Sequence, residues 1–96
     1  MAYVVAATWT AKDGEEETVL DAIKKLTPLS RDEPGNRYYQ ATRDPEDPRV
    51  FFLFEIYDEY AYKAHGASEH FEKYGFRQAI PVLASRERKF YETIDD

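Results

Sequence analysis

Two histidines, His65 and His70, are the side chains best suited to proton transfer near neutral pH. They lie five residues apart in the stretch HGASEHF, among many tyrosines and phenylalanines. On one continuous helix, five residues correspond to about 500°, so the two side chains would point about 140° apart. Helical zinc sites instead place their histidines at i and i+4. We therefore expect no metal site here, although Gly66 and Ser68 favour a helix break between the histidines.

His65 and His70 each allow a structural and a chemical interpretation. His65 lies on the expected inner side of a short helix, where a neutral imidazole can accept or donate a proton inside an aromatic pocket. It can equally be a half-buried histidine that is hydrogen-bonded to the backbone. His70 directly precedes Phe71, whose ring suits a core position, so His70 is either a surface or capping residue or a secondary contact.

Glu55 is the second unusual residue, because it lies within the otherwise apolar strand FFLFEIY. A carboxylate buried in such a strand must find a partner or raise its pKa. The partner is either an arginine on a neighbouring strand or His65, whose tautomer Glu55 would then fix. Asn36 follows Pro-Gly and is either a turn residue or a pocket donor. Trp9 belongs to the core, to a ligand wall, or to both.

Hydrophobic patterning predicts four strands and three helical segments around these residues. Pro28 ends the first helix or begins one further turn. Asp58 and Ser68 are candidate caps for two short helices, and the stretch GFRQAIP is expected to be irregular. The expected strands cover residues 3–11, 37–43, 50–58 and 83–94, and the expected helices cover residues 15–26, 59–66 and 69–74.

The order β-α-β-β-α-β predicts an α+β, ferredoxin-like fold with helices on one side of an antiparallel sheet. The opposite sheet face would carry either Phe52, Phe54 and Ile56 or Phe51, Leu53 and Tyr57. An exposed apolar face of this kind indicates a partner. We therefore expect a homodimer packed sheet to sheet.

Length and composition narrow the possible functions. The 96 residues suit a single domain over 1–96. The net charge of −6 and the scattered basic residues disfavour nucleic acid. No apolar run approaches the roughly 20 residues that span a membrane, and no signal peptide is evident. Without cysteine there is neither a disulfide nor a thiolate site. A cytoplasmic protein is expected.

The run EPGNRYYQATRDPEDPRVFFLFEIYDEYAYKAHGASEHF resembles the antibiotic biosynthesis monooxygenase domain, including its small quinol monooxygenase-like members. The matching features are EPG before a strand, RDPEDP in a hairpin, and FEIYDEYAYKAHGASEHF. The last stretch is similar to the family signature of a strand glutamate, a helix histidine and Ser-x-His-Phe. With the preceding strand and helix, the resemblance covers essentially the whole chain.

The resemblance implies a dimeric α+β barrel and a pocket for a planar aromatic or quinol-like molecule. Some relatives oxygenate such substrates without flavin, haem or metal, which implies a cofactor-free monooxygenase whose partners are an aromatic substrate and O2. By position, His65 would be the base or donor, Glu55 would orient or polarise, and Asn36 would donate a hydrogen bond. The substrate-binding residues would be Trp9, Tyr39, Phe54, His70, Phe71 and Tyr74.

The family also contains other activities. Some relatives degrade haem with a histidine at the position of Gly75, which disfavours haem here. Others isomerise or bind small phosphorylated carbonyl compounds, and a cluster of Lys and Arg in the pocket would favour that class. The alternatives to a monooxygenase are therefore an isomerase of a small carbonyl compound and a non-catalytic dimeric module that binds an aromatic metabolite.

Overall fold

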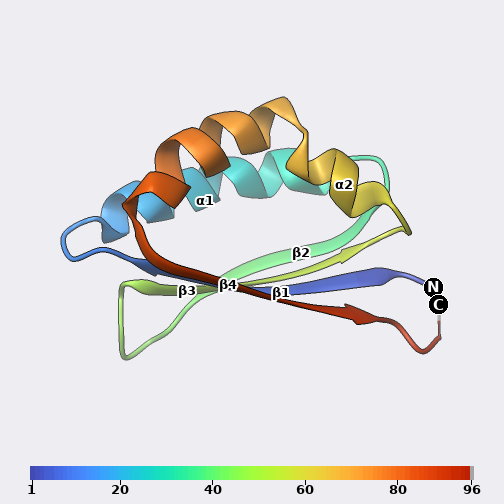
Figure 1. Ribbon diagram of the computed structural model, residues 1–96, viewed down its shortest axis with the longest axis horizontal. Coiled ribbons are helices and arrows are strands. Elements are labelled where there is room, and N and C mark those ends of the chain that lie inside the picture. Colours follow the sequence, from blue (N-terminus) through green and yellow to red (C-terminus); the bar gives the residue numbers. More distant parts are fainter. Residues whose placement is uncertain (96) are drawn as a thin grey trace.

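The computed structural model describes residues 1–95 and confirms the ferredoxin-like plan. Its four strands form one antiparallel sheet in the order β2-β3-β1-β4. The helices cover one face of this sheet (Figure 1). None of the helices in residues 1–95 is long and apolar enough to cross a membrane. The elements are β1 (Tyr3–Ala11), α1 (Glu16–Arg31), β2 (Asn36–Arg43), β3 (Val50–Tyr57), α2 (Ala61–Gly66), the π-helix η1 (Phe71–Ala79), the 3₁₀ turn η2 (Ile80–Val82) and β4 (Leu83–Glu92).

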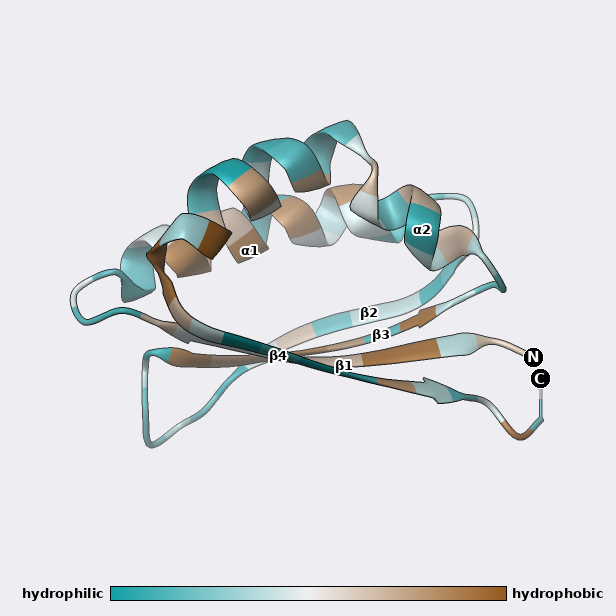
Figure 2. Ribbon diagram, in the orientation of Figure 1, coloured by the Kyte–Doolittle hydropathy of each residue, from teal (hydrophilic) through white to brown (hydrophobic). Residues whose placement is uncertain are grey.

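The core lies between the sheet and the helices. Alternate residues of each strand point to opposite faces of the sheet, so one set from β1 and β3 meets the helices. Each large side chain buried here contributes roughly 1.5–3 kcal/mol to stability. The edge strand β4 is hydrophilic over its middle (Figure 2), which discourages unwanted strand pairing at this edge. The helix-facing core residues of β1 and β3 include Val5, Ala7, Trp9, Ala11, Phe51, Leu53 and Tyr57.

The sheet face without helices carries Phe52 and Phe54, the first of the two sets that the sequence allowed. Phe52 remains 40% exposed in the single chain. The Phe54 ring packs edge-on against Tyr38, with centroids 6.0 Å apart. Phe54 therefore faces away from the helices, because Leu53 and Glu55 on either side of it point toward them. The prediction that Phe54 lines the pocket beneath the helices is wrong.

One of two helix boundaries differs from the sequence predictions. The first helix makes one further turn past Pro28 to Arg31, one of the two predicted alternatives, and the side-chain Nε of Arg31 donates to the Tyr39 carbonyl at 3.0 Å. The helix α2 begins at Ala61 and not at Glu59, and its side-chain cap is absent. Asp58, the predicted cap, instead pairs with Arg37 of β2. The competing ion pair explains why the capping prediction is wrong.

The stretch GFRQAIP is helical, contrary to the prediction of irregular structure. Phe71, Gly75 and Ala79 are spaced four apart and form the buried side of η1. A Cβ at Gly75 would lie 3.0 Å from the Phe71 ring. This glycine therefore provides room for the ring and does not break the helix. Packing against α1 outweighs its low helix propensity.

Candidate functional site

His65 lies at the centre of a cluster of aromatic rings. Its position near the end of α2 leaves it 3% exposed. The nearest ring centroids are those of Phe71 at 5.0 Å and Tyr57 at 5.3 Å. Tyr62 and Tyr39 follow at 6.1 and 6.2 Å. Strands β2 and β3 and the helical segments thus all contribute to the surroundings of this imidazole.

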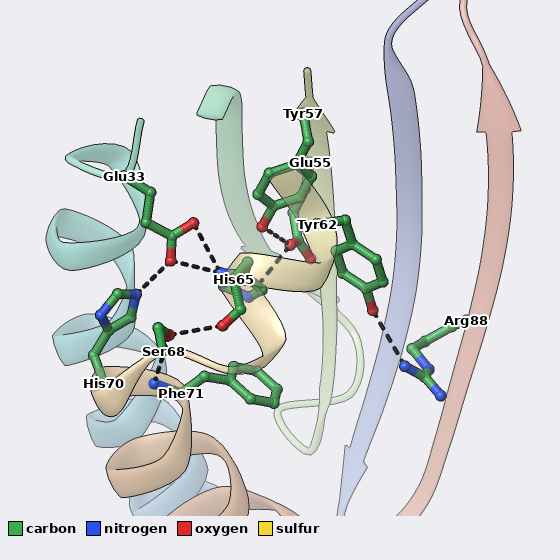
Figure 3. A network of polar contacts seen from close by, with 9 residues as sticks. All are labelled: Glu33, Glu55, Tyr57, Tyr62, His65, Ser68, His70, Phe71 and Arg88. Carbon is green, nitrogen blue, oxygen red and sulfur yellow. Dashed lines mark hydrogen bonds and ion pairs between the residues drawn. The ribbon is translucent and has the colours of Figure 1, made fainter. Parts of the chain in front are cut away.

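Glu33 holds both histidines, as Figure 3 shows. One carboxylate oxygen, Oε2, lies 2.8 Å from Nδ1 of His65 and 2.5 Å from Nε2 of His70. The second oxygen, Oε1, lies 3.1 Å from the same Nδ1. Glu33 follows the C-terminal end of α1, where its backbone N–H donates to the Ser30 carbonyl. The two histidines therefore converge on a carboxylate more than 30 residues earlier in the chain.

A break in the helix makes this convergence possible. The helix α2 ends at Gly66, and the Ser68 hydroxyl donates to the His65 carbonyl at 2.7 Å. The backbone N–H of Phe71 donates to the same hydroxyl at 3.2 Å, which confirms Ser68 as the cap of the next helical segment. The imidazole rings of His65 and His70 are 6.1 Å apart. The His65 and His70 side chains are therefore not held about 140° apart, as they would be on one continuous helix.

The sequence interpretation missed Glu33, although the hairpin pairing gives a signal for it. The strands β2 and β3 are antiparallel, with Asn36 opposite Tyr57. The loop before β2 therefore lies beside the segment after β3, and the Asp58 N–H donates to the Gly35 carbonyl at 2.7 Å. An acid just before β2 is thus placed next to the helix that carries His65.

The hydrogen bond to Glu33 assigns a tautomer to His65. A carboxylate only accepts, so Nδ1 carries the proton and Nε2 of a neutral imidazole is left without one. This Nε2 lies 3.9 Å from Oε1 of Glu55, which is too long for a hydrogen bond. Glu33, and not Glu55 as predicted, therefore orients His65.

Glu55 is buried, with 5% exposure, and its hydrogen-bond partner is Tyr57. The Tyr57 hydroxyl donates to Oε1 at 2.5 Å. Burial raises the pKa of the Glu55 carboxyl, and the Tyr57 hydrogen bond and His65 oppose part of that rise. Burial and the Glu55 carboxylate raise the pKa of the Tyr57 phenol far above its ordinary range. Tyr57 consequently stays protonated and donates.

A cavity of about 720 Å³ opens beside His65, and a volume of this size suits a small organic molecule. Its walls come from α2 and the two residues before it, from η1, from β4 and from Tyr3 of β1. A much smaller interior cleft of about 10 Å³ lies on the Glu55 side of the same imidazole. Trp9 and Tyr39 line only this cleft, which has room for no more than a water molecule. The cavity and the cleft share Tyr62, His65, Phe71, Arg86 and Arg88.

Cationic side chains from β4 form part of the cavity wall. Arg86 lies 5.9 Å from the Phe71 ring centre and 6.0 Å from that of Trp9. Its Nε is buried and has no hydrogen-bond partner within residues 1–95. Burial lowers the pKa of the Arg86 guanidinium, and the nearby Arg88 lowers it further. Arg88 donates to the Tyr62 hydroxyl at 3.2 Å. A bound molecule with acceptor groups would therefore meet donors on this wall.

Two predicted site residues do not join the group around His65. Tyr74 lies away from the His65 imidazole, and Asn36 makes no hydrogen bond to it. The Tyr74 ring faces Lys25 of α1, whose Nζ is 5.6 Å from the ring centre, and it lines neither the cavity nor the cleft. Asn36 is opposite Tyr57 in the sheet, and its Nδ2 is buried without a partner in the described part of the chain. His65, Glu55, Trp9, Tyr39 and Phe71 are brought together as expected, and His70 joins them through Glu33.

The cluster of Glu33, His65 and His70 also has the donor set of a metal site. One ligand atom from each residue lies within 4.8 Å of the others. The sequence argument against a shared metal rested on the spacing of the two histidines, which differs from the i and i+4 spacing of helical zinc sites. The helix break removes the continuous-helix geometry behind that argument, and Glu33 adds a third ligand.

Comparisons with known proteins show the family and the fold. A family model described as antibiotic biosynthesis monooxygenase matches residues 2–75. Among solved structures, PA3566 from Pseudomonas aeruginosa is 26% identical, with a TM-score of 0.89 over 97% of this chain and 94% of its own. SO0527 from Shewanella oneidensis is 27% identical, with a TM-score of 0.85 over 94% and 88%. A structure described as an antibiotic biosynthesis monooxygenase is 24% identical, with a TM-score of 0.87 over 98% and 99%. A comparison with proteins of curated function found no match.

Proposed function

Because the chain belongs to the antibiotic biosynthesis monooxygenase family, we propose that it oxidises a small phenolic compound, such as a quinol or anthrone, with O2 and without a cofactor. The observation that carries this proposal is the hydrogen bond between Glu33 and Nδ1 of His65. Glu33 accepts from Nδ1 at 2.8 Å, so the unprotonated Nε2 is the base. His65 also lines the cavity of about 720 Å³, which provides room for the substrate.

The reaction begins when Nε2 of His65 accepts the acidic proton of the substrate, the phenolic proton of an anthrol or quinol. The imidazolium that forms lies between Glu33 and Glu55, whose carboxylates stabilise its charge. An electron-rich substrate anion is itself the reductant of O2. The protein therefore supplies the base, the hydrogen-bond donors and a cavity that holds the radical pair.

The atoms and electrons balance without another reductant when an anthrone methylene becomes a carbonyl. The substrate anion gives one electron to O2, and the resulting carbon radical and superoxide combine into a peroxide. The His65 imidazolium returns its proton to this peroxide, and the C–H and O–O bonds then break to release water. One oxygen atom ends in the product and the other in water, while the methylene supplies all four electrons.

An isotope experiment tests the assignment to a monooxygenase. The protein would be incubated with a panel of quinols and anthrones under ¹⁸O2, and the products analysed by mass spectrometry. We expect one labelled oxygen atom in each product molecule and a rate that depends on the protein. Product that carries only solvent oxygen would contradict the proposal. Saturable binding without product would identify the cavity as a binding module for an aromatic metabolite.

The cationic wall favours a second candidate, an isomerase of a small anionic carbonyl compound. Lys63, Arg86 and Arg88 line the same cavity as His65. Arginine and lysine bind carboxylate and phosphate groups, and a histidine can move a proton next to a carbonyl. Turnover under nitrogen separates this candidate from the monooxygenase, because isomerisation requires no O2.

We also propose a homodimer in which the bare sheet faces pack together. Phe52, Tyr38 and Tyr91 are 40%, 49% and 50% exposed on the single chain. Over the β1–β3–β4 side of this face, a groove of about 690 Å³ is lined in part by Phe52 and Tyr91. Large exposed apolar patches mark interaction surfaces. A second copy of this chain would cover these rings by the pairing of like faces that two-fold dimers use.

A further inference from the structure

We propose that Glu33, His65 and His70 form a binding site for a divalent transition-metal ion, for which Zn²⁺ is the suitable probe. The three ligand atoms are one carboxylate oxygen and two imidazole nitrogens, and they lie within 4.8 Å of one another. Two histidines and one carboxylate are a set that zinc uses where it keeps one coordination position open. The site is separate from the substrate cavity, which only His65 of the three lines.

The site is built into the fold. The side chains of His65, Glu33 and His70 are 4%, 12% and 18% exposed. They come from α2, from the loop after α1 and from the residue before η1. The Ser68 hydroxyl fixes the turn between the two histidines through its bonds to the backbone on either side. A buried set of this kind loses little side-chain freedom when it binds an ion.

The distances require only a local adjustment for an ion to enter. Zn²⁺ lies about 2.0–2.1 Å from nitrogen and oxygen ligands, so tetrahedral ligands are about 3.4 Å from one another. The Glu33 oxygen is now 2.8 and 2.5 Å from the two nitrogens, the spacing of hydrogen bonds. The carboxylate must therefore withdraw by less than about 1 Å, and the two nitrogens, which lie within 4.8 Å of one another, must adopt the same spacing. Glu33 lies in a loop outside α1, where such a movement leaves the helix intact.

The donor set also predicts which ions bind. Imidazole suits Zn²⁺, Co²⁺, Ni²⁺ and Cu²⁺, whereas Mg²⁺ and Ca²⁺ prefer oxygen ligands. Two nitrogens and one oxygen therefore select transition metals over the hard ions. Co²⁺ is a useful second probe, because its visible absorption reports the coordination geometry.

Metal binding has a consequence for the proposed reaction. An ion at Nδ1 of His65 replaces the proton there, so a neutral imidazole then carries its proton on Nε2. The nitrogen that serves as the base becomes a donor. We therefore expect Zn²⁺ to inhibit turnover. This consequence rests on the proposed function, whereas the binding itself does not.

Isothermal titration of untagged, chelator-treated full-length protein with Zn²⁺ tests the site. We expect one ion per chain, no binding of Mg²⁺, and d–d absorption when Co²⁺ is the probe. Glu33→Gln and His70→Asn should each weaken Zn²⁺ binding by at least about 10- to 100-fold, since even an outer-shell partner contributes that much. The matched control is Glu69→Gln, which removes an exposed carboxylate beside His70 and should leave the affinity unchanged.

Three results would overturn the metal site: no saturable binding, an affinity that survives both ligand substitutions, or a loss that Glu69→Gln reproduces. Circular dichroism checks that the variants fold. Should either variant unfold, imidazole NMR shifts of the wild type with Co²⁺ provide the test, because both histidines must shift. Binding without inhibition would support the site and contradict Nε2 as the base. Inhibition reversed by a chelator would support both.

Discussion

The Glu33 carboxylate determines which nitrogen of His65 is available for chemistry. It accepts from Nδ1 at 2.8 Å, and Nε2 remains directed toward Glu55 at 3.9 Å. At this distance Glu55 makes no hydrogen bond to His65, and its partner is Tyr57. The two carboxylates thus act on opposite sides of one imidazole, Glu33 by fixing a proton and Glu55 by its nearby charge.

The raised pKa of Glu55 predicts how stability depends on pH. A carboxyl whose pKa is raised by folding stabilises the native state fully below its ordinary pKa of 4.5, and this stability is lost as pH rises through the native pKa. Glu55→Gln removes the titration and keeps an acceptor for Tyr57. The free energy of unfolding of Glu55→Gln should therefore rise relative to wild type as pH increases, by about 1.4 kcal/mol for each unit of pKa shift.

Urea denaturation of metal-free protein between about pH 4 and about pH 8 measures this difference. The protomer concentration is held fixed, because association would otherwise change the apparent stability. The control Glu69→Gln alters an exposed carboxylate and should give a difference that does not vary with pH. A Glu55→Gln difference that is constant, or that shrinks toward neutral pH, would contradict the burial of an ionisable carboxyl at this position.

At the scale of elements, Gly35 is the position where the loop that carries Glu33 packs against the start of α2. Its φ of +87° is a left-handed conformation, and a Cβ there would lie 2.7 Å from Cβ of Ala61. Gly35→Ala should therefore lower the free energy of unfolding by about 1–3 kcal/mol, from backbone strain and overpacking. It should also weaken Zn²⁺ binding, since the loop that holds Glu33 must shift.

Gly14→Ala is the matched control for this prediction. Gly14 has a similar φ of +80°, but no atom lies within 4 Å of a Cβ at that position. Gly14→Ala should lower the free energy of unfolding only by the backbone strain, roughly 1–2 kcal/mol, and should leave Zn²⁺ binding unchanged. The free energy of unfolding of both variants is measured by urea denaturation. If the two substitutions lower it equally, the contact with Ala61 does not constrain the loop.

Much of the element order could be predicted from the sequence, because alternation and helical spacing report directly on burial. The strand bounds follow closely from such local patterns, whereas the choice between the Phe52 set and the Phe51 set for the bare face does not. The helical GFRQAIP does not follow from them, since tertiary packing overrides local propensity there, and the sequence left open whether α1 extends past Pro28. The role of Glu33 depends on a contact across 32 residues, which no local spacing reveals.

At the scale of the whole molecule, the two faces of the sheet have different roles in the proposed dimer. One face packs under the helices and positions the site, and the other carries exposed aromatic rings. A carboxylate placed among those rings would lose its hydration in a dimer, which is unfavourable. In the monomer the same charge would remain in water, which costs little free energy.

Phe52→Glu should therefore convert the dimer to a monomer while the chain stays folded. Sedimentation velocity at matched concentrations gives the mass, and circular dichroism confirms the fold. Leu29→Glu is the control, because Leu29 is 42% exposed on α1, in the helical layer, and should leave the dimer intact. A wild-type monomer, or a dimer that tolerates Phe52→Glu, would contradict the sheet-to-sheet arrangement.

The central claim is that Nε2 of His65 is the base of an oxygen-dependent reaction, and oxygen uptake tests it most directly. Metal-free wild type and His65→Ala would be compared in an oxygen electrode with quinols and anthrones, with Glu69→Gln as the control. We predict protein-dependent consumption that falls by about 10²- to 10⁴-fold in His65→Ala, the usual contribution of a general base. Undiminished consumption by folded His65→Ala would contradict the account.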